Sequence, residues 1–129
     1  MEKIDGEKLI EDADFQRKIA ELEIDLAALE YTELRTLASE QAGKGPGLES
    51  SILKIKGTEI QQRITELVME GVGYYAVPFS DPLAHNEFAP GPDYAEGVTQ
   101  HYANMRKTSI YGGSNEIQRN IIAKMVLGL

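Results

Sequence analysis

Two runs of apolar residues at helical spacing constrain the fold of this 129-residue chain more than any other feature. The first five apolar residues of the first run are spaced by four, three, four and three positions. In both runs this kind of spacing places the apolar residues on one face of a helix. The first run is Phe15, Ile19, Leu22, Leu26, Leu29, Leu34 and Leu37, and the second is Leu53, Ile60, Ile64, Leu67, Val68 and Gly71. The spacing therefore predicts two amphipathic helices, over residues 14–42 and 49–75.

Glycine and proline separate the two predicted helices. The sequence GKGPG, residues 43–47, ends the first helix because glycines terminate helices and proline is not tolerated inside one. Asp14 is the expected N-cap of the first helix, and Gly57, on the apolar face of the second, predicts a close approach between helices. Because only a short turn joins the two helices, we expect them to pack antiparallel.

The C-terminal part of the chain is less regular. Residues 78–97 contain four of the five prolines and show no periodicity, which fits either an ordered loop or a flexible crossover. A short helix is expected over residues 99–107 and a final helix over residues 115–127. The apolar side of the final helix consists of Ile117, Ile121, Ile122 and Met125. No strand pattern is present, so the sequence predicts an all-α, antiparallel up-and-down helical bundle that forms a single domain over residues 1–129.

Charge and composition exclude several functions. The chain has 21 acidic and 13 basic residues, which argues against nucleic acid or an anionic membrane surface as a partner, because both require clustered Lys and Arg. It has no cysteine, so disulfides and thiolate chemistry are excluded, which fits a cytoplasmic protein. No apolar run reaches about 18 residues and the N-terminus is charged, so we predict neither a membrane span nor a signal peptide. His85 and His101 lack the i, i+4 partner of a helical metal site, so we expect no metal.

The sequence IYGGSNEIQR, residues 110–119, is the strongest candidate for a functional site. Ser114 is the expected N-cap of the final helix, and Glu116 lies in its first turn, where the helix dipole favours negative charge. On one interpretation the segment is only a turn and a helix cap. On the other, Gly112 and Gly113 let the backbone approach a phosphate or a ring, which Ser114 and the helix N-terminus bind. The residues by themselves leave both interpretations open.

Three segments resemble the C-terminal domain of flavin-dependent acyl-CoA dehydrogenases. SIYGGSNEIQRNIIAKMVLGL is similar to the family's C-terminal signature, and LVMEGVGYYAVPF to the glycine-rich end of the preceding long helix. DFQRKIAELEIDLAALEYTELR is similar to the long second helix of that domain. The segments follow the family's order and together cover nearly the whole chain. The resemblance implies a helical bundle, an FAD cofactor, α,β-dehydrogenation of an acyl-CoA substrate, an electron-transfer flavoprotein as electron acceptor, and a homo-oligomer.

The resemblance also assigns cofactor contacts to individual residues. The position matching Ser114 contacts FAD through its hydroxyl near the ribityl–pyrophosphate region, beside the helix N-terminus that follows Gly113. The position matching Glu116 lies towards the adenosine end of the cofactor. The glycine matching Gly71 lets a neighbouring subunit's backbone approach the FAD. Leu67 stands where many members have a Gln that bonds the cofactor, so that contact is lost or moved.

The expected substrate pocket includes Tyr111 and Gly112. Tyr111 matches an aromatic residue beside the acyl and flavin pocket, although a tyrosine packed at a helix start is an equal alternative. Gly112 stands where most members have the Glu that removes the α-proton, and glycine cannot be a base. In members with Gly or Ala here, the base is a carboxylate on the first helix of the C-terminal domain.

That first helix, the N-terminal helical domain and the middle β-domain are expected to be missing from this chain. We therefore predict a fragment of an acyl-CoA dehydrogenase with no catalytic residue of its own, inactive in isolation. The alternative is a non-catalytic helical oligomerisation module.

Overall fold

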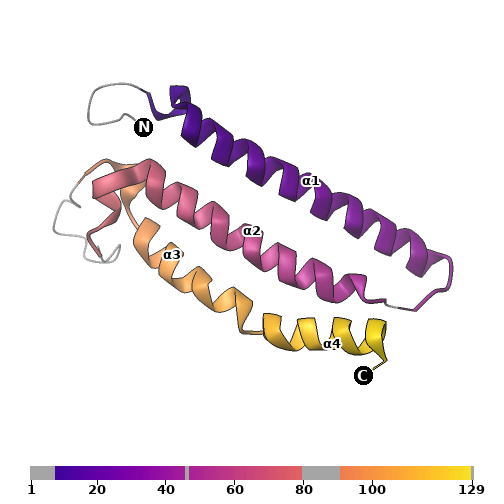
Figure 1. The fold of residues 1–129 in the computed structure, drawn as a ribbon. Helices are drawn as coiled ribbons and strands as arrows, with labels where there is room; N and C mark the ends of the chain where they lie inside the picture. The colour runs from indigo at the N-terminus through magenta and orange to yellow at the C-terminus, as the bar shows by residue number, and fades with distance from the viewer. Residues whose placement is uncertain (1–7, 46, 80–90, 129) are drawn as a thin grey trace. The chain divides into compact units, whose positions relative to one another are not determined.

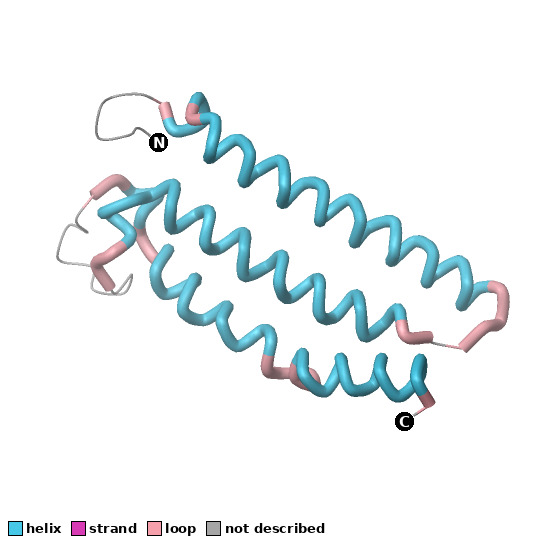
Figure 2. Tube along the Cα trace, viewed as in Figure 1, coloured by secondary structure: helices cyan, strands magenta, loops and turns pink. Residues whose placement is uncertain are grey.

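The computed structural model describes residues 8–45, 47–79 and 91–128 (Figure 1), and within these ranges every regular element is a helix (Figure 2). The α-helices are α1 (Ala13–Gln41), α2 (Glu49–Val72), α3 (Val98–Met105) and α4 (Asn115–Leu127). Short 3-10 helices lie at Leu9–Glu11, Gly73–Ala76, Asp93–Ala95 and Arg106–Ser109. The predicted all-α fold is confirmed. None of the helices in the described ranges is both long and apolar enough to cross a membrane.

The chain forms two compact units, and each unit contains part of α1 and part of α2. The first unit comprises Met1–Glu21 and Gln62–Arg106, and the second comprises Leu22–Gln61 and Lys107–Leu129. In each unit the α1 segment lies beside the α2 segment and runs in the opposite direction, as the short connection between the two helices predicts (Figure 1).

The N-cap of α1 lies two residues before the expected one, at Asp12. The carboxylate Oδ1 of Asp12 accepts a hydrogen bond from the backbone N–H of Phe15 at 2.8 Å, which satisfies one of the free amides of the first turn. The prediction that Asp14 is the N-cap is wrong. Asp14 lies inside the first turn, where its carboxylate contacts Arg17 at 2.7 Å and Lys18 at 2.8 Å.

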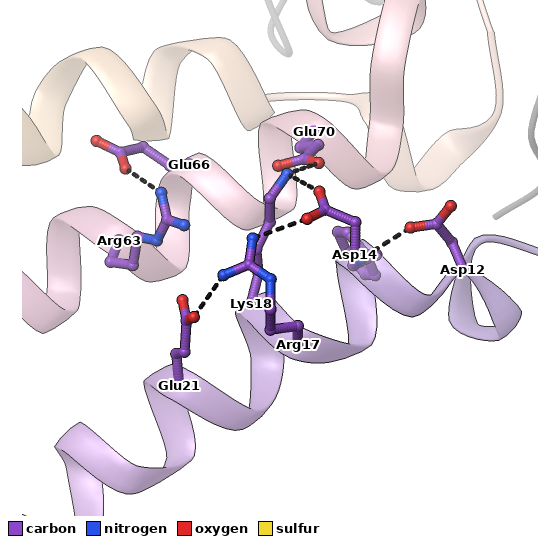
Figure 3. Close-up of polar contacts among 9 residues, drawn as sticks. Asp12, Asp14, Arg17, Lys18, Glu21, Arg63, Glu66 and Glu70 are labelled. Carbon is purple, nitrogen blue, oxygen red and sulfur yellow. Dashed lines mark hydrogen bonds and ion pairs between the residues drawn. The ribbon is translucent and has the colours of Figure 1, made fainter.

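An exposed network of ion pairs on α1 is joined to α2 by one pair, Lys18 with Glu70, in the first unit (Figure 3). Lys18 Nζ bridges the Asp14 carboxylate and Glu70 Oε1, the latter at 2.6 Å, and Arg17 pairs with both Asp14 and Glu21. Hydrogen bonds from Lys18 and then Arg17 lower the pKa of Asp14 from 3.8 to about 2. Because water screens exposed pairs, this network orients the helix surfaces more than it stabilises the fold.

Small apolar side chains form the core of the first unit. Val72, Ala76 and Ala95 are buried, and Met69 and Val98 pack against them. The Thr99 hydroxyl donates a hydrogen bond to the carbonyl of Ala76, which joins the start of α3 to this core. α2 ends at Val72 and not at the predicted residue 75, because Gly73 adopts a left-handed φ of 65° and the chain continues as a 3-10 helix.

Arg106, at the end of α3, connects this helix to α2 in the first unit. Its Nη2 donates to the Gln62 carbonyl and to Thr65 Oγ1, both at 2.9 Å, and its Nη1 lies 2.9 Å from Glu66 Oε1. The guanidinium carbon lies 4.4 Å from the centre of the Tyr102 ring, which is a cation–π contact. The sequence analysis assigned no role to this arginine.

The inward face of α2 differs from the predicted one. Ile60 and Leu67 are buried as expected, but Ile64 and Val68 are each 41% exposed. The polar residues Ser51 and Thr65 are buried in their place, together with Ile55 and Val72. The apolar residues of α2 cover a wide arc, and the neighbouring helices bury only part of that arc.

The inward face of α1 departs further from the prediction than that of α2. Phe15, Ile19, Leu22 and Leu29 are half-buried, whereas Leu26, Leu34 and Leu37 are about half exposed. Beyond Leu29 the half-buried positions are Thr32, Thr36 and Ser39. In α4, Ile122 is half-buried, but Ile117, Ile121 and Met125 are exposed.

Gly57 lies against α1 but does not require a close approach. A Cβ atom built on Gly57 would lie 3.9 Å from Leu29 Cδ2, which is an ordinary van der Waals contact. The predicted close approach is therefore wrong: the two helices touch here and leave room for a methyl group. Gly43, with φ of 79°, follows α1 as the sequence predicts. Pro46 and residues 80–90 of the irregular segment, His85 included, lie outside the described residues.

Candidate functional site

The segment 109–114, from the last residue of the 3-10 helix Arg106–Ser109 to the N-cap of α4, carries the candidate residues predicted from the sequence, and we call it the 109–114 loop. Gly112 and Gly113 have φ of 66° and 87°, a left-handed conformation that favours glycine over any residue with a side chain. A Cβ built on Gly112 would meet nothing within 4 Å, whereas one on Gly113 would lie 2.8 Å from Gln118 Nε2. The backbone at Gly112 is thus bare and open.

Ser114 is the N-cap of α4, as predicted. Its backbone is extended, and its Oγ accepts a hydrogen bond from the N–H of Ile117 at 3.4 Å. Glu116 lies in the first turn of the helix, and its pKa is lowered first by its own backbone N–H and then by the Ser114 hydroxyl. The Ser114 hydroxyl therefore accepts a hydrogen bond from the helix backbone and still has its own proton to donate.

Two buried residues bound the loop. Thr108, on one side, is 1% exposed, and Asn115, on the other, is 5% exposed. Lys54 Nζ, from α2, donates to Asn115 Oδ1 at 2.7 Å and lies 3.4 Å from the Thr108 carbonyl. Asn115 Nδ2 in turn donates to Thr58 Oγ1 at 3.1 Å. All four residues belong to the second unit.

The contacts of Lys54, Thr58 and Asn115 were not predicted from the sequence. One signal was available: Ser51, Lys54 and Thr58 recur at spacings of three and four, so they form a polar stripe within a helix whose other face is apolar. Polar residues at these spacings indicate a polar partner on the neighbouring element.

The middle of the loop is exposed. Ile110 is 69% exposed and Tyr111 is 56% exposed, and both glycines are exposed as well. Tyr111 is therefore not packed within this chain. The loop places Tyr111, Gly112, Gly113 and Ser114 at consecutive positions, and Glu116 lies two residues after Ser114, in the first turn of α4.

The remaining candidate residues lie in the first unit, on α2. Gly71 is half-buried, and Leu67 is 7% exposed, so its side chain is part of the apolar interior of that unit. His101 is exposed on α3. Within the described ranges no group of three or more His, Cys, Asp and Glu residues has a geometry that could hold a metal ion.

Comparison with known proteins gives consistent matches. The family described as "Acyl-CoA dehydrogenase, C-terminal domain" matches residues 2–127. Acyl-CoA dehydrogenase IpdE1 of Mycobacterium tuberculosis is 33% identical over 105 residues, which are 77% of this chain and 24% of that protein. Acyl-CoA dehydrogenase IpdE1 of Mycolicibacterium smegmatis is 33% identical over 104 residues, or 81% of this chain and 22% of that protein. The chain thus spans about a quarter of the length of these relatives.

Proposed function

The chain belongs to the family of acyl-CoA dehydrogenase C-terminal domains, and we propose that it is the part of an FAD-dependent acyl-CoA dehydrogenase that supplies one side of the flavin site. The whole enzyme would introduce a double bond between the α- and β-carbons of an acyl-CoA thioester and pass the electrons to an electron-transfer flavoprotein. When bound, FAD would supply the acceptor for the hydride that leaves the β-carbon.

The exposed glycine loop before α4 is the observation that carries this proposal. Two consecutive glycines with left-handed φ expose bare backbone, and the open space over Gly112 lets a flat ring or a chain of hydroxyls lie against it. Ser114 and the first amides of α4 follow immediately, so polar groups of the cofactor can be bound beside the bare backbone. The residues present fit a flavin, with Gly112, Gly113 and Ser114 as its contacts and Tyr111 at the rim.

The charge at the start of α4 favours the hydroxyl groups of the cofactor over its diphosphate. The pKa of Glu116 is lowered, which favours the ionised carboxylate, so this side chain disfavours a second anion beside it. A ribityl or ribose hydroxyl can instead donate to the Glu116 carboxylate, and the single Ser114 proton can turn from Glu116 towards that hydroxyl. We infer that Ser114 and Glu116 bind sugar hydroxyls and that the diphosphate is neutralised elsewhere.

The base that removes the α-proton comes from outside this loop. Gly112 has no side chain, and its left-handed backbone disfavours a replacement that does. The open space above it leaves room for a carboxylate that arrives from another part of the enzyme. The chain alone is therefore inactive, and Gly71 on α2 contributes backbone to a flavin site completed by a neighbouring subunit.

A helical oligomerisation module is the second candidate function. Ile24, Tyr31, Leu34 and Leu37 are each about half exposed or more on α1. Apolar side chains clustered along one helix mark interaction surfaces. The two functions are compatible, because α1 would join subunits while the 109–114 loop contacts the flavin.

Titration with FAD tests the flavin proposal. In the complete enzyme, Ser114→Asp keeps an N-cap acceptor but removes the hydroxyl donor. We therefore expect flavin affinity to fall about fivefold, which corresponds to the loss of one hydrogen bond of about 1 kcal/mol. Ser50→Ala, an exposed serine in the first turn of α2, is the matched control and should bind flavin normally.

Two further measurements test the inactivity of the chain and its association. The isolated chain mixed with FAD and acyl-CoA esters should neither become a stoichiometric yellow protein nor bleach flavin above background. If Ser114→Asp leaves flavin affinity unchanged in the complete enzyme and light scattering shows that the chain associates through α1, the oligomerisation function stands and the flavin contact is refuted.

A further inference from the structure

One lysine on α2 holds both ends of the glycine loop. Lys54 Nζ donates to Asn115 Oδ1 at 2.7 Å, directly after the loop, and lies 3.4 Å from the carbonyl of Thr108, directly before it. Thr108 and Asn115 are among the most buried polar residues of the described chain, at 1% and 5% exposure. A single ammonium group therefore connects the two points where the loop enters and leaves the protein surface.

A second contact fixes the orientation of the Asn115 amide. Lysine can only donate, so the amide oxygen must face Lys54, and the amide nitrogen is left to donate to Thr58 Oγ1 at 3.1 Å. The Thr58 hydroxyl donates to the Ile55 carbonyl of its own helix at 2.9 Å. Lys54 and Thr58 lie at i and i+4, on one face of α2. The first residue of α4 is thereby held in one orientation on α2.

The loop between these anchors has little to hold it by itself. Its centre is exposed, and two successive glycines with left-handed φ give the backbone many alternative conformations. Helix stability does not explain the lysine, since a cation near the N-terminus of α4 opposes the helix dipole. The contacts of Lys54 with the two ends of the loop do explain it.

We propose that Lys54 is a positioning residue that acts through Asn115 and Thr108 to hold the 109–114 loop in the conformation that receives the flavin. The inference rests on the proposed function, in which this loop contacts the cofactor. Lys54 does not touch the flavin in this scheme. Lys54 restricts the loop to the conformation that binds the flavin. Removing Lys54 lowers the fraction of molecules with this loop conformation, and the apparent flavin affinity falls in proportion.

Hydrogen exchange and flavin titration on the complete flavoenzyme that contains this chain test the proposal. Lys54→Met removes the charge and both contacts, and Lys54→Gln provides a polar second variant that is too short to reach both ends. Lys54→Arg keeps a cation that can donate to both oxygens. Lys56→Met is the matched control, because Lys56 is an exposed lysine of the same helix and pairs with Glu59, one turn along α2.

In the apo form we expect the amides at the two ends of the loop to exchange roughly tenfold faster in Lys54→Met and Lys54→Gln. These amides are Ile110, Tyr111 and Ile117, which are hydrogen bonded in the structure. Exchange in α3 should be unchanged, which separates a loosened loop from a loss of fold. Flavin affinity should fall roughly tenfold in the same variants, as expected when the competent loop fraction falls tenfold. Lys54→Arg should restore both values, and Lys56→Met should change neither.

Three other results would overturn the inference. The first is unchanged exchange at the loop ends in both Lys54→Met and Lys54→Gln. The second is faster exchange with unchanged flavin affinity, in an enzyme whose flavin affinity does fall with Ser114→Asp. The third is unchanged flavin affinity in Ser114→Asp as well: this result contradicts the proposed function itself, and the role of Lys54 in flavin binding fails with it.

Discussion

Replacing Gly57 by alanine should stabilise the protein. Gly57 lies inside α2, where glycine is less favourable than alanine by about 1 kcal/mol. The added methyl would lie 3.9 Å from Leu29 Cδ2, which is contact without overlap. Gly57 is half-buried, so burying the methyl adds roughly 0.4 kcal/mol, half the value for a fully buried methylene. We therefore expect the free energy of unfolding to rise by about 1 to 1.5 kcal/mol and the melting temperature by about 5 °C.

Urea denaturation followed by circular dichroism at the helical band measures this change. Gly97→Ala is the control: its Cβ would likewise overlap no atom, but Gly97 has φ of 74°, so this variant should be destabilised by about 1 kcal/mol. Comparing Gly57→Ala with Gly97→Ala separates the effect of available space from the effect of backbone conformation on stability. An unchanged or lower midpoint for Gly57→Ala would refute the reasoning, because it would mean that the helices approach more closely at Gly57 than a methyl allows.

Four further variants test the first unit. Asp12→Ala should lower the free energy of unfolding by about 1 kcal/mol through loss of the α1 cap, whereas Asp14→Ala at neutral pH should cost less, as thermal melts of the two will show. The pKa of Asp14 is lowered in the folded state, so its contribution to stability is complete above pH 3.8 and is lost as the pH falls to about 2. The melting temperature of the wild type should accordingly fall more than that of Asp14→Asn over this window, and parallel curves would contradict the ion-pair assignment. Arg106→Lys should cost roughly 2 kcal/mol in urea titrations, because lysine cannot reproduce the forked contacts to α2, and a neutral result would count against them.

Local sequence patterns predicted the helices because helix formation depends mainly on residues that are close together in the sequence. The period of apolar residues fixed α1 and α4 to within one residue, and Ser114 was found as a cap because a serine directly precedes the helical pattern. The cap of α1 was harder to predict. Asp12 and Asp14 both precede apolar residues of α1, and only the position of the first free amide in space decides between the two carboxylates.

Burial was predicted less well, because it depends on neighbours that are distant in sequence. Ile64 and Val68 continue the apolar pattern of α2 but are partly exposed, while Thr65 between them is buried beneath Arg106. The family resemblance supplied the candidate loop, yet it gave no reason for the loop to keep its shape. That reason is a contact between residues 61 positions apart, Lys54 and Asn115, which no local pattern links.

The antiparallel pairing of α1 and α2 also has a consequence for the order of folding. The contact between Leu29 and Gly57 closes a short segment around the turn, whereas Lys18 and Glu70 are 52 positions apart. Because the entropy cost of closing a chain segment grows with its length, we expect the turn-proximal parts of α1 and α2 to pair first. Contacts of α4 with α2 span about 60 residues and should form later. Mutations near the turn should then slow refolding, whereas mutations at Asn115 should mainly accelerate unfolding, and the glycine loop would be among the last segments to become ordered.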